Sequence, residues 1–379
     1  MKRRNFLTLI GLSALSGITG CQPSQIRQSL KSAQQLSNGD LPSAVTAHIP
    51  ITGNAQIDQL VKRQIKSLVA ELTKTWGDKK VASPKEYVKY TDHYQSRALV
   101  NFKSGQIRVE TLIDQASKQT LKAAIISTLL TPENPSKVDL LSDKRIATGQ
   151  QPFLYELVLD QDNKPIATEW RANRYADFLI KTAYQSDRYN QKTRHFVLFN
   201  MVKNHTQSQQ RHYAAQVMRH SQRFQLEPAL VYAIIETESA FNPYAMSHIP
   251  AYGLMQIVPQ SAGRDAYRFL YKKDGTPTKN YLLQADNNIE MGAVYLHLLF
   301  TRYLAKITHP KSQEYCCIAA YNTGSGNVLK AFDADRQQAV DKINSLNADQ
   351  VYRHLRSHLK YQEARHYLEK VTEKKQAYL

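Results

Sequence analysis

The segment from residue 228 to 240 restricts the possible folds of this chain more than any other. Pro228 is suited to the first turn of a helix, and apolar residues follow it at intervals of three and four. This spacing predicts an amphipathic helix. Ile234 and Glu238 are four residues apart, so Glu238 continues the apolar stripe, whereas Glu236 belongs to the opposite, solvent-facing side. A carboxyl group therefore stands where a core residue is expected.

The position of Glu238 has a chemical consequence. Burial disfavours the charged form of a carboxyl group, and a carboxylic acid that keeps its proton near neutral pH can act as a general acid. A glutamate in the last turn of an apolar face can equally be a half-exposed residue without a chemical role. The helix alone leaves both interpretations open.

Further motifs follow this helix in a fixed order. They are Glu238-Ser239-Ala240-Phe241-Asn242-Pro243, then Ser247, then Gly253-Leu254-Met255-Gln256, and finally Ala320-Tyr321-Asn322-Thr323-Gly324-Ser325-Gly326. Together they resemble the catalytic domain of the soluble-type lytic murein transglycosylases, and the resemblance extends from about residue 213 to the end. Many relatives carry Gly where this chain has Pro250, a departure that affects the loop before Gly253 but not the motif.

The resemblance implies an all-α, lysozyme-like domain that cleaves peptidoglycan. Most glycosidases use two carboxylates, but here Glu236 is on another helix face and Asp265 lies in a polar stretch typical of a solvated charge. In this family Glu238 would protonate the glycosidic oxygen, the acetamido group would assist, and the sugar 6-hydroxyl would close the 1,6-anhydro ring. The reaction needs no cofactor.

The resemblance also implies which residues bind the sugars. These are Ser247, Gly253, Met255, Gln256, Tyr321, Asn322 and Tyr367. By residue type, Gly253 would let the backbone approach a sugar, Gln256 and Ser247 offer hydrogen bonds, and Tyr367 would approach the catalytic carboxyl. Each has a structural alternative as a loop, cap or core residue, and Met255 is as well suited to the core. Tyr244 and Tyr252 could stack on sugars or fill the surface.

Two alternatives remain open at this stage. A goose-type lysozyme-like hydrolase would cleave the same bond but needs a carboxylate that positions water. A non-catalytic peptidoglycan-binding lipoprotein would be expected to lose the Glu238 motif, which this chain retains.

The first residues are typical of export. Three basic residues precede an uncharged run from Phe6 to Ile18 and small residues before Cys21, so residues 1–20 resemble a lipoprotein signal peptide with Cys21 as the lipidated residue. Arg3-Arg4 also resembles a twin-arginine signal. Gln22 after Cys21 suggests the periplasmic face of the outer membrane, by the sorting pattern of such lipoproteins.

Between the signal and the catalytic domain the composition changes twice. Residues 21–51 are rich in Gln, Ser and Pro and are typical of a tether. Residues 52–205 predict a non-catalytic α+β domain, and residues 206–379 the all-α catalytic domain. In the α+β domain we expect helices over 57–76, 115–130 and 172–184, a hairpin around Lys103-Ser104-Gly105, and strands over 153–159 and 196–202. In the catalytic domain we expect further helices over 213–224, 287–304 and 315–321.

The chain is strongly basic. Its formal net charge is +18, and removal of the three basic signal residues leaves +15. This charge favours polyanions, and for an exported chain without a nucleic-acid-binding motif we expect peptidoglycan carboxylates and anionic lipids, not nucleic acid. Cys316 and Cys317 are adjacent and read as small buried residues, and no sequence cluster has metal-ligand spacing.

Overall fold

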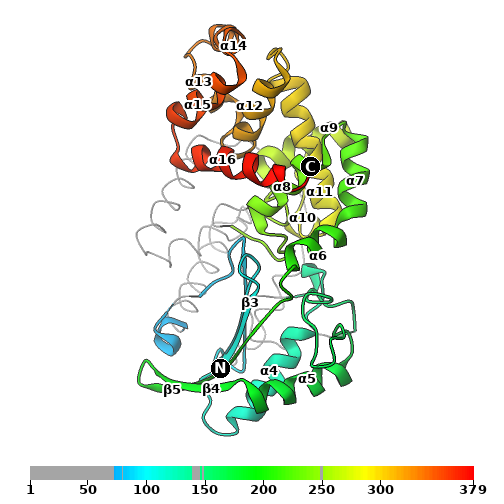
Figure 1. Cartoon of the computed structure of the whole chain (residues 1–379), viewed down its shortest axis with the longest axis vertical. Coiled ribbons are helices and arrows are strands. Elements are labelled where there is room, and N and C mark those ends of the chain that lie inside the picture. Colours follow the sequence, from blue (N-terminus) through cyan, green and yellow to red (C-terminus); the bar gives the residue numbers. More distant parts are fainter. Residues whose placement is uncertain (1–71, 79, 139–145, 147–148, 248–250) are drawn as a thin grey trace.

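The computed structural model describes residues 72–78, 80–138, 146, 149–247 and 251–379. These residues form an antiparallel sheet with helices at one end of the molecule and a helical bundle at the other (Figure 1). The predicted order of an α+β part followed by an all-α part is therefore confirmed. Within the described residues, no helix is long and apolar enough to span a membrane.

The sheet has five antiparallel strands in the order β1-β2-β3-β5-β4. The strands are β1 (Glu86–Thr91), β2 (Ser96–Asn101), β3 (Gln106–Thr111), β4 (Tyr184–Tyr189) and β5 (Lys192–Asn200). The β2–β3 hairpin confirms its prediction, with Val100 opposite Ile107. Its turn places Gly105 at φ 73°, a conformation that favours glycine.

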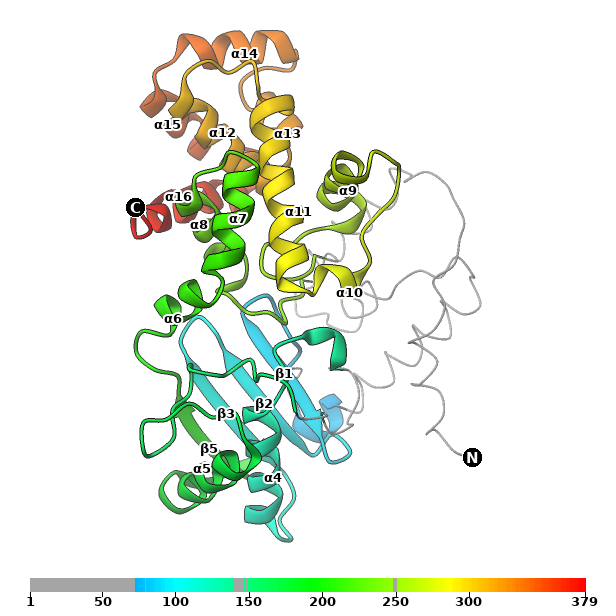
Figure 2. The ribbon, with the colours of Figure 1, turned by 90° about the vertical axis from the view of Figure 1, so that its right-hand side faces the viewer.

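Two helices cover one face of the sheet, as Figure 2 shows. They are α4 (Ser117–Leu129) and α5 (Glu169–Thr182), close to their predicted ranges. Alternate residues of the strands, such as Val100, Ile107 and Val197, are 1% exposed or less beneath them. This alternation is the reason that the hairpin could be recognised from sequence.

One predicted strand is wrong. Residues 153–158 form turns and a bend, and Leu159 forms only an isolated bridge with Pro165. The side chains of Phe153, Leu154, Leu157 and Val158 fill the core of the α+β part. A short apolar run indicates burial but does not by itself define a strand. The helix expected over 57–76 lies mostly outside the described residues, and residues 72–76 are helical.

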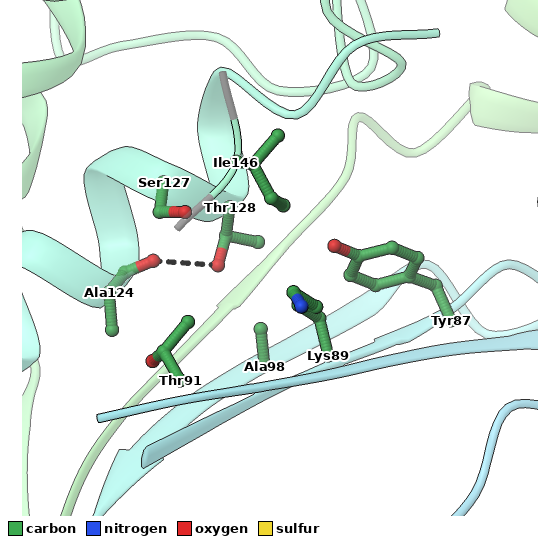
Figure 3. Close-up of a pocket in the computed structure, with 8 residues that line it drawn as sticks. All are labelled: Tyr87, Lys89, Thr91, Ala98, Ala124, Ser127, Thr128 and Ile146. Atoms are coloured by element: carbon green, nitrogen blue, oxygen red, sulfur yellow. Dashed lines mark hydrogen bonds between the residues drawn. The ribbon is translucent and has the colours of Figure 1, made fainter. Parts of the chain in front are cut away.

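A small pocket lies between α4 and the sheet (Figure 3). Its lining consists of Tyr87, Lys89, Thr91, Ala98, Ala124, Ser127, Thr128 and Ile146. Thr128 Oγ1 donates a hydrogen bond to the carbonyl oxygen of Ala124 at 2.7 Å. Among the described lining residues Lys89 is the one charged side chain, and we assign the pocket no function.

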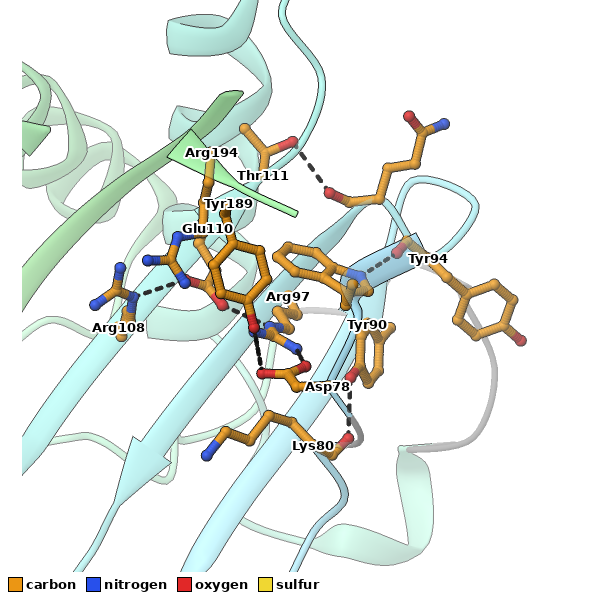
Figure 4. A network of polar contacts seen from close by, with 12 residues as sticks. Asp78, Lys80, Tyr90, Tyr94, Arg97, Arg108, Glu110, Thr111, Tyr189 and Arg194 are labelled. Carbon is orange, nitrogen blue, oxygen red and sulfur yellow. Dashed lines mark hydrogen bonds and ion pairs between the residues drawn. The ribbon is translucent and has the colours of Figure 1, made fainter. Parts of the chain in front are cut away.

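The other face of the sheet carries a charged network (Figure 4). The Arg97 guanidinium lies 3.9 Å from the centre of the Trp76 ring and forms ion pairs of 2.5 Å with both Asp78 and Glu110. Glu110 also accepts from Arg108 at 2.6 Å. Removing one partner from such a buried network would leave an uncompensated charge, so we assign it a structural role.

The second part of the chain is helical. Its helices are α6 (His205–His212), α7 (Ala214–Arg223), α8 (Pro228–Ser239), α9 (Arg264–Tyr271), α10 (Lys279–Leu282), α11 (Ala285–Leu298), α12 (Pro310–Thr323), α13 (Ser325–Lys330), α14 (Arg336–Ser345), α15 (Ala348–His358) and α16 (Gln362–Gln376). The long helix expected over 287–304 is α11 continued by a π-helical turn, Leu299–Tyr303. α7 and α16 both pack against α8, which lies inside the bundle (Figure 1).

Candidate active site

Helix α8 is buried on every side. Residues 229–235 are each no more than 6% exposed, and between residues 229 and 240 only Glu236 and Glu238 are not buried. The prediction of a one-sided apolar stripe was therefore too narrow, because helices pack around α8 from several directions. The helix ends where Ala240 and Phe241 adopt positive φ angles of 50° and 62°, which turn the chain sharply after the motif glutamate.

Glu236 differs from its expected solvent-facing position. It is partly buried, and its two carboxylate oxygens accept hydrogen bonds from Lys374 Nζ and from the Tyr378 hydroxyl, the latter at 2.7 Å. The sequence prediction of its environment is wrong because the end of the chain returns to cover this side of α8. Glu236 thus attaches the last turns of α16 to the central helix.

Glu238 lies in a different environment. Its side chain is partly exposed, although protein atoms surround the carboxyl densely. The pKa of Glu238 is raised to about 7. Burial is the largest cause, and Glu363 also raises this pKa, whereas the nearby Tyr367 and Lys85 lower it. The Tyr367 hydroxyl is buried and forms no hydrogen bond of regular geometry within the described structure, but it lies close enough to the Glu238 carboxyl to lower its pKa. A carboxyl group with this pKa is protonated in a large fraction of molecules at neutral pH.

Tyr321 and Met255 meet at the same site. The Tyr321 hydroxyl donates to the carbonyl oxygen of Met255 at 2.9 Å. The Tyr321 pKa is raised, mainly by burial and next by the negative charge of Glu238. The Met255 side chain is fully buried. Its sulfur packs directly on Gly292, where an added Cβ would lie only 2.3 Å from the sulfur. Met255 therefore contributes its backbone to this contact, and its side chain belongs to the core.

Gly253 allows a close packing contact inside the protein. Its φ is +74°, and an added Cβ would lie 2.4 Å from both the carbonyl oxygen of Leu282 and Nδ2 of Asn288. Its N–H donates to the carbonyl oxygen of Ala245 at 2.9 Å. The close approach that requires glycine here is to the protein backbone.

Asn288 is a positioning residue that the sequence analysis missed. It is fully buried, and its Oδ1 accepts from the Met255 N–H at 2.7 Å. Its Nδ2 donates to the carbonyl oxygens of Tyr252 and Leu282 at 2.7 and 2.8 Å. In the sequence Asn288 stands among other polar residues, Asp286, Asn287 and Glu290, so no local pattern singled it out. Asn288 holds the 252–255 loop in place.

Three other predicted residues lie partly exposed near these elements. Gln256 donates from Nε2 to the carbonyl oxygen of Gly253 at 2.9 Å, while its Oε1 has no partner among the described residues. The Ser247 N–H donates to the carbonyl oxygen of Ala251 at 3.1 Å. Asn322 is in the last turn of α12, before Gly324.

The motif loop also contacts the α+β part. The Asn242 side chain donates to the carbonyl oxygen of Pro84 at 3.1 Å, and the Tyr244 hydroxyl donates to that of Pro132. Tyr244 is 1% exposed, with ring centres 5.1 Å from Tyr87 and 5.4 Å from Phe153. Tyr244 is therefore a core residue of the junction and is not placed to stack on a sugar.

Two charged groups near Glu238 were also missed, Lys85 before β1 and Glu363 at the start of α16. Asp265, expected to be solvated, is partly buried and accepts from the Tyr303 hydroxyl at 2.8 Å. Within the described residues no group of acidic, His or Cys side chains could hold a metal ion. Cys316 and Cys317 are buried in α12, and Cys21 lies outside the described residues.

The site therefore combines one acid of raised pKa with buried tyrosines and a rigid backbone loop. Such a group can donate a proton to a leaving oxygen and later accept one. Four of the residues lie around this centre: Glu238, Tyr321, Met255 and Tyr367. Gly253 instead packs against Leu282 and Asn288, behind the loop.

Both parts of the chain are similar to known proteins. Residues 54–212 match the family model described as membrane-bound lytic murein transglycosylase C, N-terminal domain, and residues 216–344 match the transglycosylase SLT domain. The chain is 42% identical over 306 residues to the membrane-bound lytic murein transglycosylase C proteins of Klebsiella pneumoniae (strain 342) and Serratia proteamaculans (strain 568). Each alignment covers 80% of this chain and 85% of the relative. A solved lytic transglycosylase Slt from Pseudomonas aeruginosa is 25% identical, with TM-score 0.34, over 44% of this chain and 24% of that one.

Proposed function

Because the chain belongs to the membrane-bound lytic murein transglycosylase C family, and is thus a lytic transglycosylase of peptidoglycan, we propose that it forms 1,6-anhydromuramic acid ends. The bond cleaved is the β-1,4 bond between N-acetylmuramic acid and N-acetylglucosamine. Glu238 is the one catalytic residue, acting first as an acid and then as a base.

The proposed steps conserve every proton. Glu238 donates its proton to the glycosidic oxygen, which leaves as the 4-hydroxyl of N-acetylglucosamine while the acetamido group of the muramyl residue supports the anomeric carbon. The muramyl 6-hydroxyl then attacks that carbon, and the Glu238 carboxylate takes the hydroxyl proton. No water is consumed, and no metal or cofactor enters the reaction.

The observation that supports this proposal is the single carboxyl group with a pKa of about 7 beside Tyr367 and Tyr321. A general acid works best when its pKa is near the working pH. The backbone loop held by Asn288 and the Tyr321 hydroxyl provides a fixed wall for the sugars.

The test is a digest of purified sacculi analysed by mass spectrometry. We expect muropeptides whose mass is one water below that of the hydrolysis product. Glu238→Gln should release none of them above background, and Glu236→Gln should release them at nearly the wild-type rate. Products that carry a reducing muramic end would contradict the transglycosylase mechanism.

One observation favours the hydrolase alternative. The exposed carboxylate of Glu363 acts on Glu238 from the first turn of α16, where a second carboxylate could direct a water molecule. In that case Glu363→Gln would abolish formation of the reducing end. We favour the transglycosylase because one carboxyl group suffices when the substrate supplies the nucleophile.

We also propose that lipidation of Cys21 holds the protein on the periplasmic face of the outer membrane. Two or more acyl chains give stable anchoring, whereas electrostatic association is removed by salt. Cys21→Ser should therefore move the protein to the soluble fraction at high salt. Retention of this variant with the membranes would refute the assignment of the anchor.

A further inference from the structure

Lys85 has a fixed position at the junction of the two parts. Its carbonyl oxygen accepts from the Phe102 N–H at 2.9 Å, and that of the preceding residue, Pro84, accepts from the Asn242 side chain at 3.1 Å. Asn242 follows Glu238 by four residues in the motif. The backbone of Lys85 is thus attached on one side to the sheet and on the other to the catalytic loop.

Among the described residues, no carboxylate forms an ion pair with the ammonium group of Lys85. The residue is partly buried, and none of the described side chains forms a hydrogen bond or an ion pair with its Nζ. Burial and the neighbouring Lys370, Lys374 and Lys103 lower the Lys85 pKa, and Glu238 raises it. A cation in such surroundings is costly unless an anion joins it.

Carboxylates of the described residues neutralise only part of the positive charge around Lys85. Lys374 is already paired with Glu236, whereas Lys370, one turn earlier on α16, is exposed. Tyr367, beside the Glu238 carboxyl, precedes Lys370 by three residues on the same helix, so Lys370 and Tyr367 share a face. Two lysines from different parts of the chain therefore lie near the reacting group.

We propose that Lys85, assisted by Lys370, binds a carboxylate of the stem peptide carried by the muramyl residue at the cleavage site. The inference rests on the proposed function, which places a muramyl residue at Glu238. Stem-peptide carboxylates are the anions that such a substrate brings to this place. The α+β part then contributes directly to the choice of substrate, through one side chain.

The test compares two substrates that share one glycan backbone. One is peptide-bearing glycan strands. The other is the same strands after an amidase has removed the stem peptides, which leaves a lactyl carboxylate on each muramyl residue in place of the stem-peptide carboxylates. Loss of a charged hydrogen bond lowers kcat/KM by about ten- to a hundredfold. We expect Lys85→Met to lower kcat/KM by this factor more on the peptide-bearing strands than on the stripped strands, because a change in the Glu238 pKa affects both substrates alike. Lys85→Arg should retain most of the wild-type value.

Lys181→Met is the matched control. Lys181 is an exposed lysine of α5 in the α+β part, and its replacement by Met removes the same charge as Lys85→Met. It should leave both kcat/KM values unchanged. Lys85→Gln provides a second neutral variant, and circular dichroism verifies folding of each. Equal losses on both substrates, or no loss on either, would overturn the role of Lys85.

The same digests separate this inference from the proposed function. The product end, anhydro or reducing, is read from the wild-type protein by mass spectrometry. A reducing end would refute the transglycosylase mechanism while the ratio between the two substrates still reports on Lys85.

Discussion

Replacement of Glu238 by Gln should make the protein more stable at neutral and alkaline pH. Burial raises the pKa of Glu238 from its ordinary value of 4.5 to about 7. Between these two values the unfolded chain releases a proton that the folded protein retains, so the stability of the wild type falls as pH rises. Glutamine does not ionise in either state and avoids this loss.

The size of the effect follows from the pKa. Each pKa unit corresponds to about 1.4 kcal/mol, so the rise to about 7 is worth about 3 kcal/mol. This is an upper value, because the Glu238 side chain is partly exposed to solvent. The free energy of unfolding of Glu238→Gln minus that of the wild type should grow between pH 4.5 and 7 and stay constant above.

The assay is urea unfolding below pH 4.5 and above pH 7, followed by far-ultraviolet circular dichroism, which reports mainly on the helical part. Both tryptophans, Trp76 and Trp170, belong to the α+β part, so fluorescence follows that part separately. The same variant should lose about 10²- to 10⁴-fold in activity. A stability difference that does not change with pH would refute the argument for a buried, protonated carboxyl group.

Four further predictions follow from the contacts of the site. Glu236→Gln should keep its activity but lose about 1 to 2 kcal/mol of unfolding free energy, measured in urea, because its bond with Lys374 is weakened. Glu363→Gln should move the alkaline limb of the kcat/KM profile to lower pH, because its charge no longer raises the pKa of Glu238; an unchanged limb would contradict this. Gly253→Ala should cost about 2 kcal/mol or more in thermal or urea unfolding, since its Cβ would lie 2.4 Å from a backbone oxygen. Dialysis against a chelator should leave the rate of sacculus digestion unchanged, and a loss restored by one divalent ion would contradict a mechanism without metal.

Some predictions depended on local patterns and agreed with the structure for that reason. The β2–β3 hairpin could be predicted from the alternation of apolar and polar residues around Val100 and Ile107. In a half-buried strand every second side chain faces the core. β4 was missed because its sequence, Tyr184–Tyr189, is mostly exposed and polar. Edge strands of this kind are defined by pairing with a neighbour, which leaves little local signal.

The sequence by itself determined the helix that carries Glu238 and the residue type near its end. Three- and four-residue spacing, Pro228 and the motif after Glu238 are all local, so they predict α8 and a carboxyl group in apolar surroundings. The tertiary structure alone decided which groups surround that carboxyl. Lys85 and Asn242 belong to segments brought together across 158 residues by the bond to Pro84, and α16 returns from the end of the chain to place Tyr367 there. Contacts between distant segments arise from packing of the whole chain, and no local periodicity encodes them.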